Sequence, residues 1–215
     1  MSTDPHAASP ILTAGPGPEA AAGTIIMIHG RGATAESILS LLPELELEID
    51  VAAIAPQAPN NSWYPQSFLS ALEANEPYLG SALKKIETIV SDLLSRGVAS
   101  SRIALLGFSQ GACLTSEYVA RHPRKYGAAM VLTGGLIGPP GTARNYAGSL
   151  GGTPVFIGTS DPDPHVPFER VEETGAVLTK LGAAVDLRRY PGMPHTINEE
   201  EIGACRALLE AMVKE

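Results

Sequence analysis

The sequence predicts an α/β fold in which a mostly parallel sheet is flanked by helices on both faces. Short apolar runs recur along the chain, each bounded by turn residues, and four of them are nearly continuous, as in strands covered on both sides. Segments with helical periodicity separate these runs, and strands that alternate with helices form parallel sheets through crossover connections. The length of 215 residues suits one domain, which we place at residues 10–215 with no large cap domain.

The predicted strands follow from the apolar runs. Residues 1–9 are expected to be a disordered lead-in, and "ILTAG" at 11–15 is expected to form a short edge strand. The main strands are predicted at 24–30, 51–56, 102–108, 128–134, 153–159 and 185–192. Between the fourth and fifth of these lies a long, polar, Gly-rich loop at 135–152, and long loops are often functional.

The predicted helices fill the intervals between the strands. They span residues 34–45, 71–97, 110–123, 167–182 and 198–215. Thr34 and Asn198 are expected N-caps, because a side-chain oxygen at that position accepts a hydrogen bond from a free backbone N–H. Gly97 and Gly182 are expected to end two of the helices, and Pro123 follows the end of a third.

Composition limits the partners and the compartment. The chain has 15 basic and 23 acidic residues, a net charge of −8, which disfavours nucleic acid and anionic membrane surfaces. Two cysteines are too few for a disulfide framework. No segment approaches the ~18 apolar residues of a membrane span. The first residues contain no Lys or Arg, unlike a secretory signal, so we expect a cytoplasmic protein without membrane insertion.

The pentapeptide "GFSQG" at 107–111 marks a candidate nucleophile. Ser109 follows a buried strand and opens a helix, which is the arrangement of a nucleophile elbow. Gly107 and Gly111 flank the sharp turn, where the absence of a Cβ allows neighbouring backbone to approach. The alternative is a serine N-cap in a Gly-rich loop, but the strand–turn–helix context favours the nucleophile.

A serine needs a base, and the base needs an acid. Among five histidines, His195 lies between the last strand and the last helix, at the edge where ligands bind in such sheets. His6 falls in the expected tail. Asp161 and Asp163 both follow the strand at 153–159, and the residues alone leave the choice between them open. The order serine, aspartate, histidine is that of α/β-hydrolases.

The stretch "HGRG" supplies the remaining part of such a site. In this fold the oxyanion hole combines the N–H that follows the nucleophile with one from an early strand-to-helix loop. These groups are the backbone N–H of Gln110 and of Arg31. The role belongs to the backbone, so the guanidinium of Arg31 is not required for it.

These motifs resemble the phospholipase/carboxylesterase group of small α/β-hydrolases, which includes acyl-protein thioesterases. The matching stretches run in order from about residue 24 to 210 and are "HGRGA", "PQAPNNSWYPQSF", "GFSQGA", "DPDPHVP" and "YPGMPHTINEEEI". Two of them, "HGRGA" and "SWYPQSF", look more like the bacterial branch often described as hydroquinone-resistance hydrolases. The family pattern D-x-x-V-P selects Asp163 over Asp161, and G-x-x-H-x-I supports His195. The resemblance implies an esterase with no metal or organic cofactor, a shallow site and often a homodimer.

The sequence departs from the thioesterases before Trp63. Those enzymes carry a longer apolar segment at this point, whereas here it is short and polar, "PNNSW". We therefore expect a serine carboxylesterase for small or short-acyl esters, with Trp63 and Tyr64 as candidates for a substrate wall. Trp63 packing a loop is the alternative.

A thioesterase or lysophospholipase for longer acyl groups is the second functional hypothesis, and a non-catalytic ligand-binding protein is the third. The sequence does not decide whether Cys113 lies near the pocket.

Overall fold

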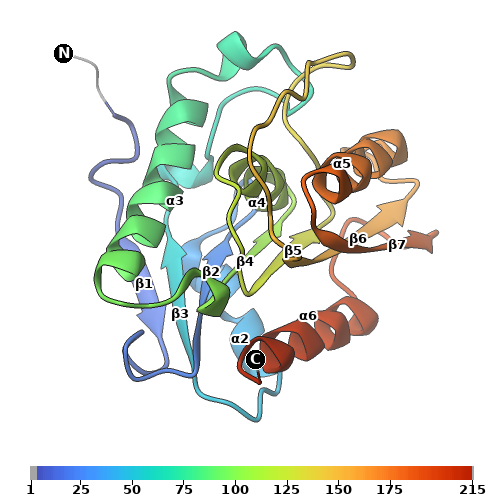
Figure 1. Ribbon diagram of the computed structural model, residues 1–215. Coiled ribbons are helices and arrows are strands. Elements are labelled where there is room, and N and C mark those ends of the chain that lie inside the picture. Colours follow the sequence, from blue (N-terminus) through green and yellow to red (C-terminus); the bar gives the residue numbers. More distant parts are fainter. Residues whose placement is uncertain (1–3, 215) are drawn as a thin grey trace.

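The computed structural model describes residues 4–214, and within them seven strands form one sheet (Figure 1). The strand order is β1-β3-β2-β4-β5-β6-β7. The strands are β1 (Ile11–Ala14), β2 (Gly23–Ile28), β3 (Val51–Pro56), β4 (Ile103–Phe108), β5 (Ala128–Leu132), β6 (Pro154–Asp161) and β7 (Ala184–Pro191). Only β1 pairs antiparallel, at the edge beside β3, among the strands of the described chain. The predicted mostly parallel sheet and its short edge strand are confirmed.

Helices cover both faces of the sheet, as predicted. They are α1 (Ala35–Leu39), α2 (Leu41–Glu44), α3 (Tyr78–Ser95), α4 (Gln110–Arg121), α5 (Phe168–Lys180) and α6 (Glu199–Met212), with short 3-10 turns at η1 (Pro59–Asn61), η2 (Leu72–Asn75) and η3 (Ser100–Arg102). The helices α3, α4 and α5 pack on one face, and α1 and α6 pack on the other. Alternate residues of β2 enter the two cores. Ile26 and Ile28 belong to the core on the side of α3, α4 and α5, whereas Ile25 and Met27 belong to the core on the side of α1 and α6.

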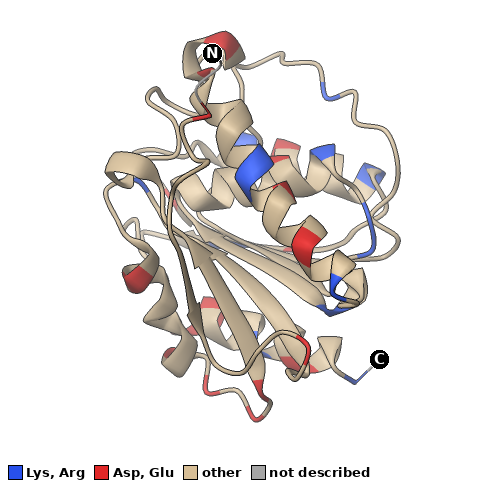
Figure 2. Cartoon of the chain, turned by 90° about the vertical axis from the view of Figure 1, so that its left-hand side faces the viewer, with Lys and Arg blue, Asp and Glu red and all other residues tan. Residues whose placement is uncertain are grey.

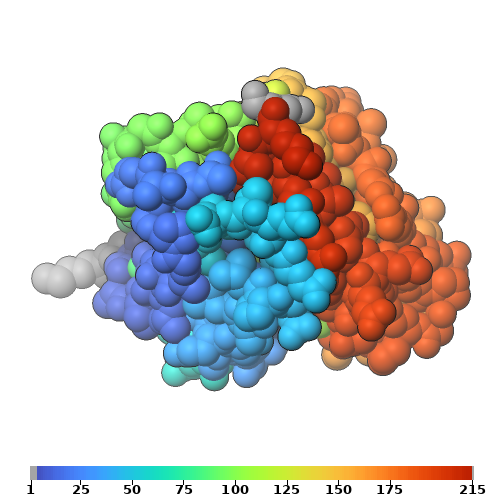
Figure 3. Space-filling model, turned by 90° about the horizontal axis from the view of Figure 1, so that it is seen from below, coloured from blue at the N-terminus to red at the C-terminus, as the bar shows by residue number. Residues whose placement is uncertain are grey.

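Charge is kept out of the centre of the sheet. The strands β1 to β5 contain no charged residue, and Figure 2 shows the acidic and basic residues spread over the outer helices and loops. This distribution explains why these strands read as near-continuous apolar runs in the sequence. Seen from below in Figure 3, α6 lies against the segment before β3, where Arg206 donates to the Leu45 carbonyl at 2.6 Å.

Two predicted helices have different bounds, and proline explains both. The helix expected at 34–45 is divided into α1 and α2, because Pro43 has no N–H with which to continue the hydrogen-bond ladder from residue 39. The helix expected at 71–97 begins only at Tyr78, after η2 and Pro77. The predicted N-caps hold: Thr34 and Asn198 each form a capping box with the residue three positions later.

The expected disordered lead-in is wrong for residues 4–9. Residues 1–3 of that segment lie outside the described residues. His6 is fully buried, its backbone N–H donates to Ser81 Oγ at 2.9 Å, and its ring stacks on Trp63 with centroids 5.5 Å apart. The segment is therefore a packed turn against α3, which a polar sequence with little periodicity did not reveal.

Candidate active site

Ser109 occupies a strained turn between β4 and α4. Its backbone has φ 55° and ψ −117°, a conformation that residues other than glycine rarely adopt. Its N–H donates to the Leu132 carbonyl at 3.0 Å, which ties the turn to β5. A Cβ on Gly111 would lie 2.0 Å from the Ile28 carbonyl oxygen, and one on Gly107 would lie 2.2 Å from the Gly111 carbonyl oxygen. The two glycines therefore allow the start of α4 to lie directly on the sheet.

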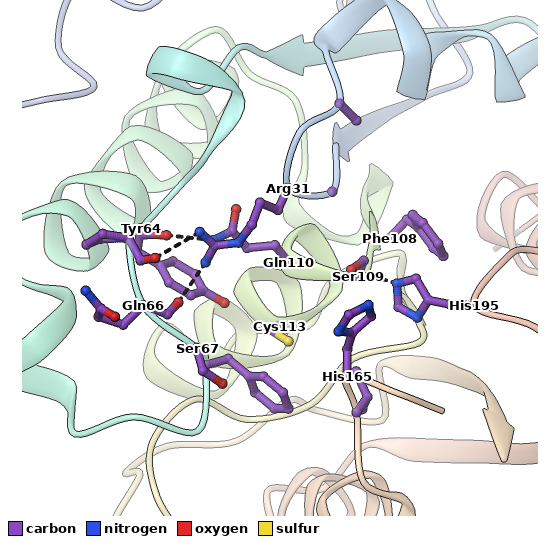
Figure 4. A pocket seen from close by; sticks show the side chains of 15 residues that line it. Arg31, Tyr64, Gln66, Ser67, Phe108, Ser109, Gln110, Cys113, His165 and His195 are labelled. Carbon is purple, nitrogen blue, oxygen red and sulfur yellow. Dashed lines mark hydrogen bonds between the residues drawn. The ribbon is translucent and has the colours of Figure 1, made fainter. Parts of the chain in front are cut away.

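The three residues predicted as nucleophile, base and acid meet in one chain of hydrogen bonds. His195 Nε2 lies 2.9 Å from Ser109 Oγ (Figure 4). On the other side of the ring, His195 Nδ1 lies 2.7 Å from Asp163 Oδ2. Ser109 follows β4, Asp163 follows β6 and His195 follows β7, so the carboxyl ends of three parallel strands bring them together. With the proton on Nδ1, Nε2 can accept the serine proton, and the carboxylate can stabilise the imidazolium that forms.

Asp163 is held as a carboxylate. Its side chain is fully buried, and burial acts to raise its pKa. Hydrogen bonds outweigh that effect and place the pKa of Asp163 below its usual value: Ser160 Oγ and His195 donate to Oδ2, and the N–H groups of His165 and Val166 donate to Oδ1. These four donors fix the carboxylate in position.

The other aspartates lie apart from the histidine. Asp161 forms an ion pair with Arg189 on the surface. Asp186 forms an exposed ion pair with Arg188, the surface position expected for a charge on an edge strand. The structure therefore brings Asp163, and not Asp161, into contact with His195, which is the choice that the family pattern indicated.

The backbone N–H groups of Arg31 and Gln110 are both available beside Ser109. Within residues 4–214 neither N–H donates to another group of the chain. Gln110 is the first residue of α4, so its N–H points out of the helix N-terminus, where the helix dipole favours negative charge. The next residue in the early loop, Gly32, instead donates to the Asn61 carbonyl at 2.7 Å and anchors that loop.

Trp63 does not form a substrate wall. Its side chain is fully buried and does not line the cavity at Ser109. The indole N–H donates to the His29 carbonyl at 2.9 Å, and the Trp63 N–H donates to Gln110 Oε1 at 2.9 Å. The Gln110 amide in turn donates to the Tyr64 carbonyl at 2.9 Å. Trp63 therefore packs the loop, the alternative that the sequence left open, and connects the two segments that carry the free N–H groups.

A cavity of about 470 Å³ opens beside Ser109. Tyr64 lines it, as the sequence suggested, together with residues that the sequence did not single out. These are Gln66, Ser67, Phe68, Phe108, His165 and Val166. His165 stands edge-on to His195 with ring centroids 5.1 Å apart; its place two residues after Asp163 was the available signal. No aspartate or glutamate is among the lining residues, although the whole chain has 23 acids.

The long loop at 135–152 contributes no residue to the cavity lining. Arg170 Nη1 donates to the carbonyls of Leu136 and Gly138, both at 2.6 Å, and the Ile137 N–H donates to Glu117 Oε2 at 3.0 Å. The start of the loop is therefore fastened to α4 and α5, and it does not cover the cavity.

Cys113 reaches the cavity but does not resemble a nucleophile. It lies one turn after Ser109 in α4 and is 2% exposed. Burial raises the pKa of its thiol to about 12, so the thiol stays protonated near neutral pH. In Figure 4 its sulfur lies at the end of the cavity beside Tyr64.

The Arg31 side chain fastens the wall of the cavity. Its guanidinium donates to the carbonyls of Pro65 at 2.9 Å and Gln66 at 2.7 Å and to Ser62 Oγ at 3.1 Å, and Figure 4 shows it turned away from Ser109. Arg31 lines the same cavity as Ser109, while its side chain holds the neighbouring loop. Within residues 4–214 no group of three or more metal-ligating side chains is present, and no helix is long and apolar enough to cross a membrane.

Comparison with known proteins agrees with the fold and the motifs. The family model described as Phospholipase/Carboxylesterase matches residues 14–213. The chain belongs to the phospholipase/carboxylesterase family. A crystal structure of a phospholipase/carboxylesterase from Dyadobacter fermentans has a TM-score of 0.88 and 44% sequence identity over 97% of both chains. The family resemblance and the α/β-hydrolase fold expected from the sequence are confirmed.

Curated relatives of this family member carry two kinds of name. A probable carboxylesterase SOBER1-like protein from Arabidopsis thaliana is 26% identical over 195 residues, which cover 83% of this chain and 74% of that protein. An acyl-protein thioesterase 1 from Gibberella zeae is 26% identical over 212 residues, which cover 86% and 88%. Both names describe hydrolysis of an acyl bond.

Proposed function

We propose that this member of the phospholipase/carboxylesterase family is a serine carboxylesterase that hydrolyses small or short-acyl esters. The observation that carries the proposal is the continuous hydrogen-bonded chain from Ser109 through His195 to Asp163 at the edge of a cavity. The family match supports hydrolysis as the reaction class. In the proposed mechanism the catalytic groups all come from the chain itself, and water is the second reactant.

In this mechanism Ser109 Oγ attacks the ester carbonyl while His195 Nε2 accepts its proton. The oxyanion receives hydrogen bonds from the backbone N–H groups of Arg31 and Gln110, and loss of one such donor typically costs about 2.7–4 kcal/mol of transition-state stabilisation. His195 then gives the proton to the departing alcohol, which leaves an acyl-enzyme on Ser109. Water activated by His195 cleaves that intermediate and restores the serine.

The preference for short acyl groups follows from the cavity and from the segment before Trp63. The cavity of about 470 Å³ has the size of a small-molecule site, and Phe68, Cys113 and Val166 line it. The polar segment Pro59–Asn61 forms a tight 3-10 turn, and none of its residues lines the cavity. The cavity size and the short polar turn favour a carboxylesterase for short acyl groups. The second candidate is a thioesterase or lysophospholipase for longer chains, and the thioesterase name of some relatives supports it.

The first test is the initial hydrolysis rate on p-nitrophenyl esters of increasing acyl length, with Ser109→Ala in parallel. The proposal expects a rate that depends on Ser109 and is greatest at short chains. A serine-dependent maximum at long chains would move the assignment to the thioesterase or lysophospholipase. No activity, together with failure of a fluorophosphonate probe to label Ser109, would favour a non-catalytic binding protein.

A further inference from the structure

A second cavity adjoins the first at the candidate base. It has a volume of about 370 Å³ and shares Gly30, Ala33, Phe108 and His195 with the larger cavity. We call it the side groove. In Figure 4 Phe108 and His195 lie on one side of Ser109, and Cys113 and Tyr64 lie on the other. Ser109 lines only the larger cavity, and the side groove joins that cavity on the side of Ser109 where Phe108 and His195 lie.

An ester extends in two directions from its carbonyl carbon, as an acyl half and an alcohol half. The reaction chemistry decides which half lies in which cavity. Ser109 Oγ first adds to that carbon, and the bond to the alcohol oxygen breaks only when the resulting oxyanion intermediate collapses. The serine proton, taken up by His195 Nε2, passes to that alcohol oxygen as it leaves. Since Nε2 lies 2.9 Å from Ser109 Oγ, the alcohol oxygen must also lie within its reach. The alcohol therefore departs on the His195 side, and the acyl group extends toward Cys113.

The large side chains that line the side groove are mostly apolar, and Ser37 and Thr196 add hydroxyl groups to its wall. Ile38 from α1, Leu41 at the start of α2 and Ile197, two residues after the histidine, line it together with Phe108. Ile38 is 4% exposed, so this part of the groove is formed by core side chains. Contact with this apolar surface removes apolar atoms of a bound alcohol from water and so favours its binding.

The outer end of the side groove is acidic. Leu41 and Ile197 also line a neighbouring cavity, whose charged residues are Glu44, Glu46, Glu199 and Arg206. Arg206 is paired with Glu46 at 2.7 Å, which leaves two acids in excess. A carboxylate carried on the alcohol would meet this negative charge.

We propose that the side groove binds the alcohol half of the ester and selects apolar alcohols without negative charge. Leu41 and Ile197 determine this selectivity. The inference rests on the proposed function, since it assigns one half of the substrate to a subsite of the same reaction centre.

The test measures kcat/KM for acetate esters that differ only in the alcohol, followed by titration of the acid released. Wild type is expected to prefer benzyl acetate to ethyl acetate. Leu41→Ala should lower the benzyl-to-ethyl ratio by ~10-fold, the low end for lost groups in an apolar pocket, because the groove is open to solvent. The acetate ester of 4-(hydroxymethyl)benzoate should react more slowly than benzyl acetate, and added salt should reduce that difference.

Leu42→Ala is the matched control. Leu42 is the adjacent leucine, is also half-buried against the same core, and lines a different cavity. Its truncation has a similar structural cost and should leave the benzyl-to-ethyl ratio at the wild-type value. An equal ratio in wild type and both variants would overturn the inference while ester hydrolysis stands.

The reverse assignment has its own signature. If the side groove held the acyl group, Leu41→Ala would change the preference between ethyl acetate and ethyl hexanoate and not the preference between alcohols, which also overturns the inference. If wild type hydrolyses no ester faster than Ser109→Ala does, the proposed function itself fails, and the inference falls with it.

Discussion

Replacing Gly111 with alanine tests whether the close approach of α4 to β2 positions Ser109. The new Cβ would lie 2.0 Å from the Ile28 carbonyl oxygen and 2.7 Å from the His29 carbonyl oxygen. Ordinary contact begins at 3.4 Å, so the helix start would have to move by about 1.4 Å. The opposing atoms are backbone and cannot rotate away, so the movement must carry Ser109 with it.

Two magnitudes follow from this displacement. Inserting a group into a packed core costs typically 1–3 kcal/mol and occasionally more, and with rigid backbone opposite we expect a loss of about 3 kcal/mol or more in the free energy of unfolding. A misplacement of about 1 Å in a catalytic group lowers the rate by about 10²-fold. Urea denaturation measures the first quantity. The second is kcat/KM on p-nitrophenyl acetate, at a temperature where the variant remains folded.

Gly203→Ala is the control within the same chain. Gly203 lies in α6, and a Cβ there would meet nothing within 4 Å. Alanine should therefore stabilise the helix by about 0.5–1 kcal/mol and leave kcat/KM unchanged. Wild-type stability and wild-type kcat/KM in Gly111→Ala would refute the argument that this glycine sets the position of Ser109.

Three further experiments, two with substitutions and one by thiol labelling, test other parts of the site and the fold. In Asp163→Asn the amide nitrogen would face His195 Nδ1, which drives the proton to Nε2; kcat should fall by about 10⁴-fold, and near-normal turnover would contradict the role of Asp163. Burial raises the pKa of Glu201 to about 7 from 4.5, so its contribution to stability is present below about pH 4.5 and lost as pH rises through 7. The free energy of unfolding, measured by denaturation across this pH range, should therefore rise by about 3 kcal/mol for Glu201→Gln relative to wild type. A difference between the two proteins that stays constant with pH would exclude the effect. Burial raises the pKa of both thiols, that of Cys113 to about 12, so a chromogenic disulfide reagent at about pH 8 should label neither cysteine in the folded protein and both in denaturant.

The sequence was informative where one physical requirement dominates. Parallel strands buried on both faces need continuous apolar runs, so β2 to β6 could be placed within a few residues. The turn at Ser109 needs glycines where backbone approaches backbone, so "GFSQG" predicted the strand–turn–helix arrangement. The family pattern selected Asp163, and the structure places it, rather than Asp161, against His195.

The sequence did not predict the packing of residues whose contacts are with partners distant along the chain. The segment at residues 4–9 is polar, yet His6 packs between Trp63 and Tyr78, residues that follow it by more than fifty positions. Trp63 itself has one polar atom and a large apolar ring, which suit a substrate wall or a core equally well. Only the acceptor at His29, which the fold supplies, decided between them.

The same contacts explain how the strained turn persists. A positive φ at Ser109 costs on the order of 1–3 kcal/mol and persists only because the neighbouring residues hold it. The Leu132 carbonyl accepts a hydrogen bond from the Ser109 N–H, and Gly111 lets the sheet pack directly beneath the turn. The side-chain amide of Gln110 accepts from the Trp63 N–H and donates to the Tyr64 carbonyl, which fixes the adjacent loop. Trp63 continues this support to His29 and so to the loop that carries the Arg31 N–H. Loss of the Trp63 side chain should therefore lower kcat as well as stability, although Trp63 does not line the cavity at Ser109.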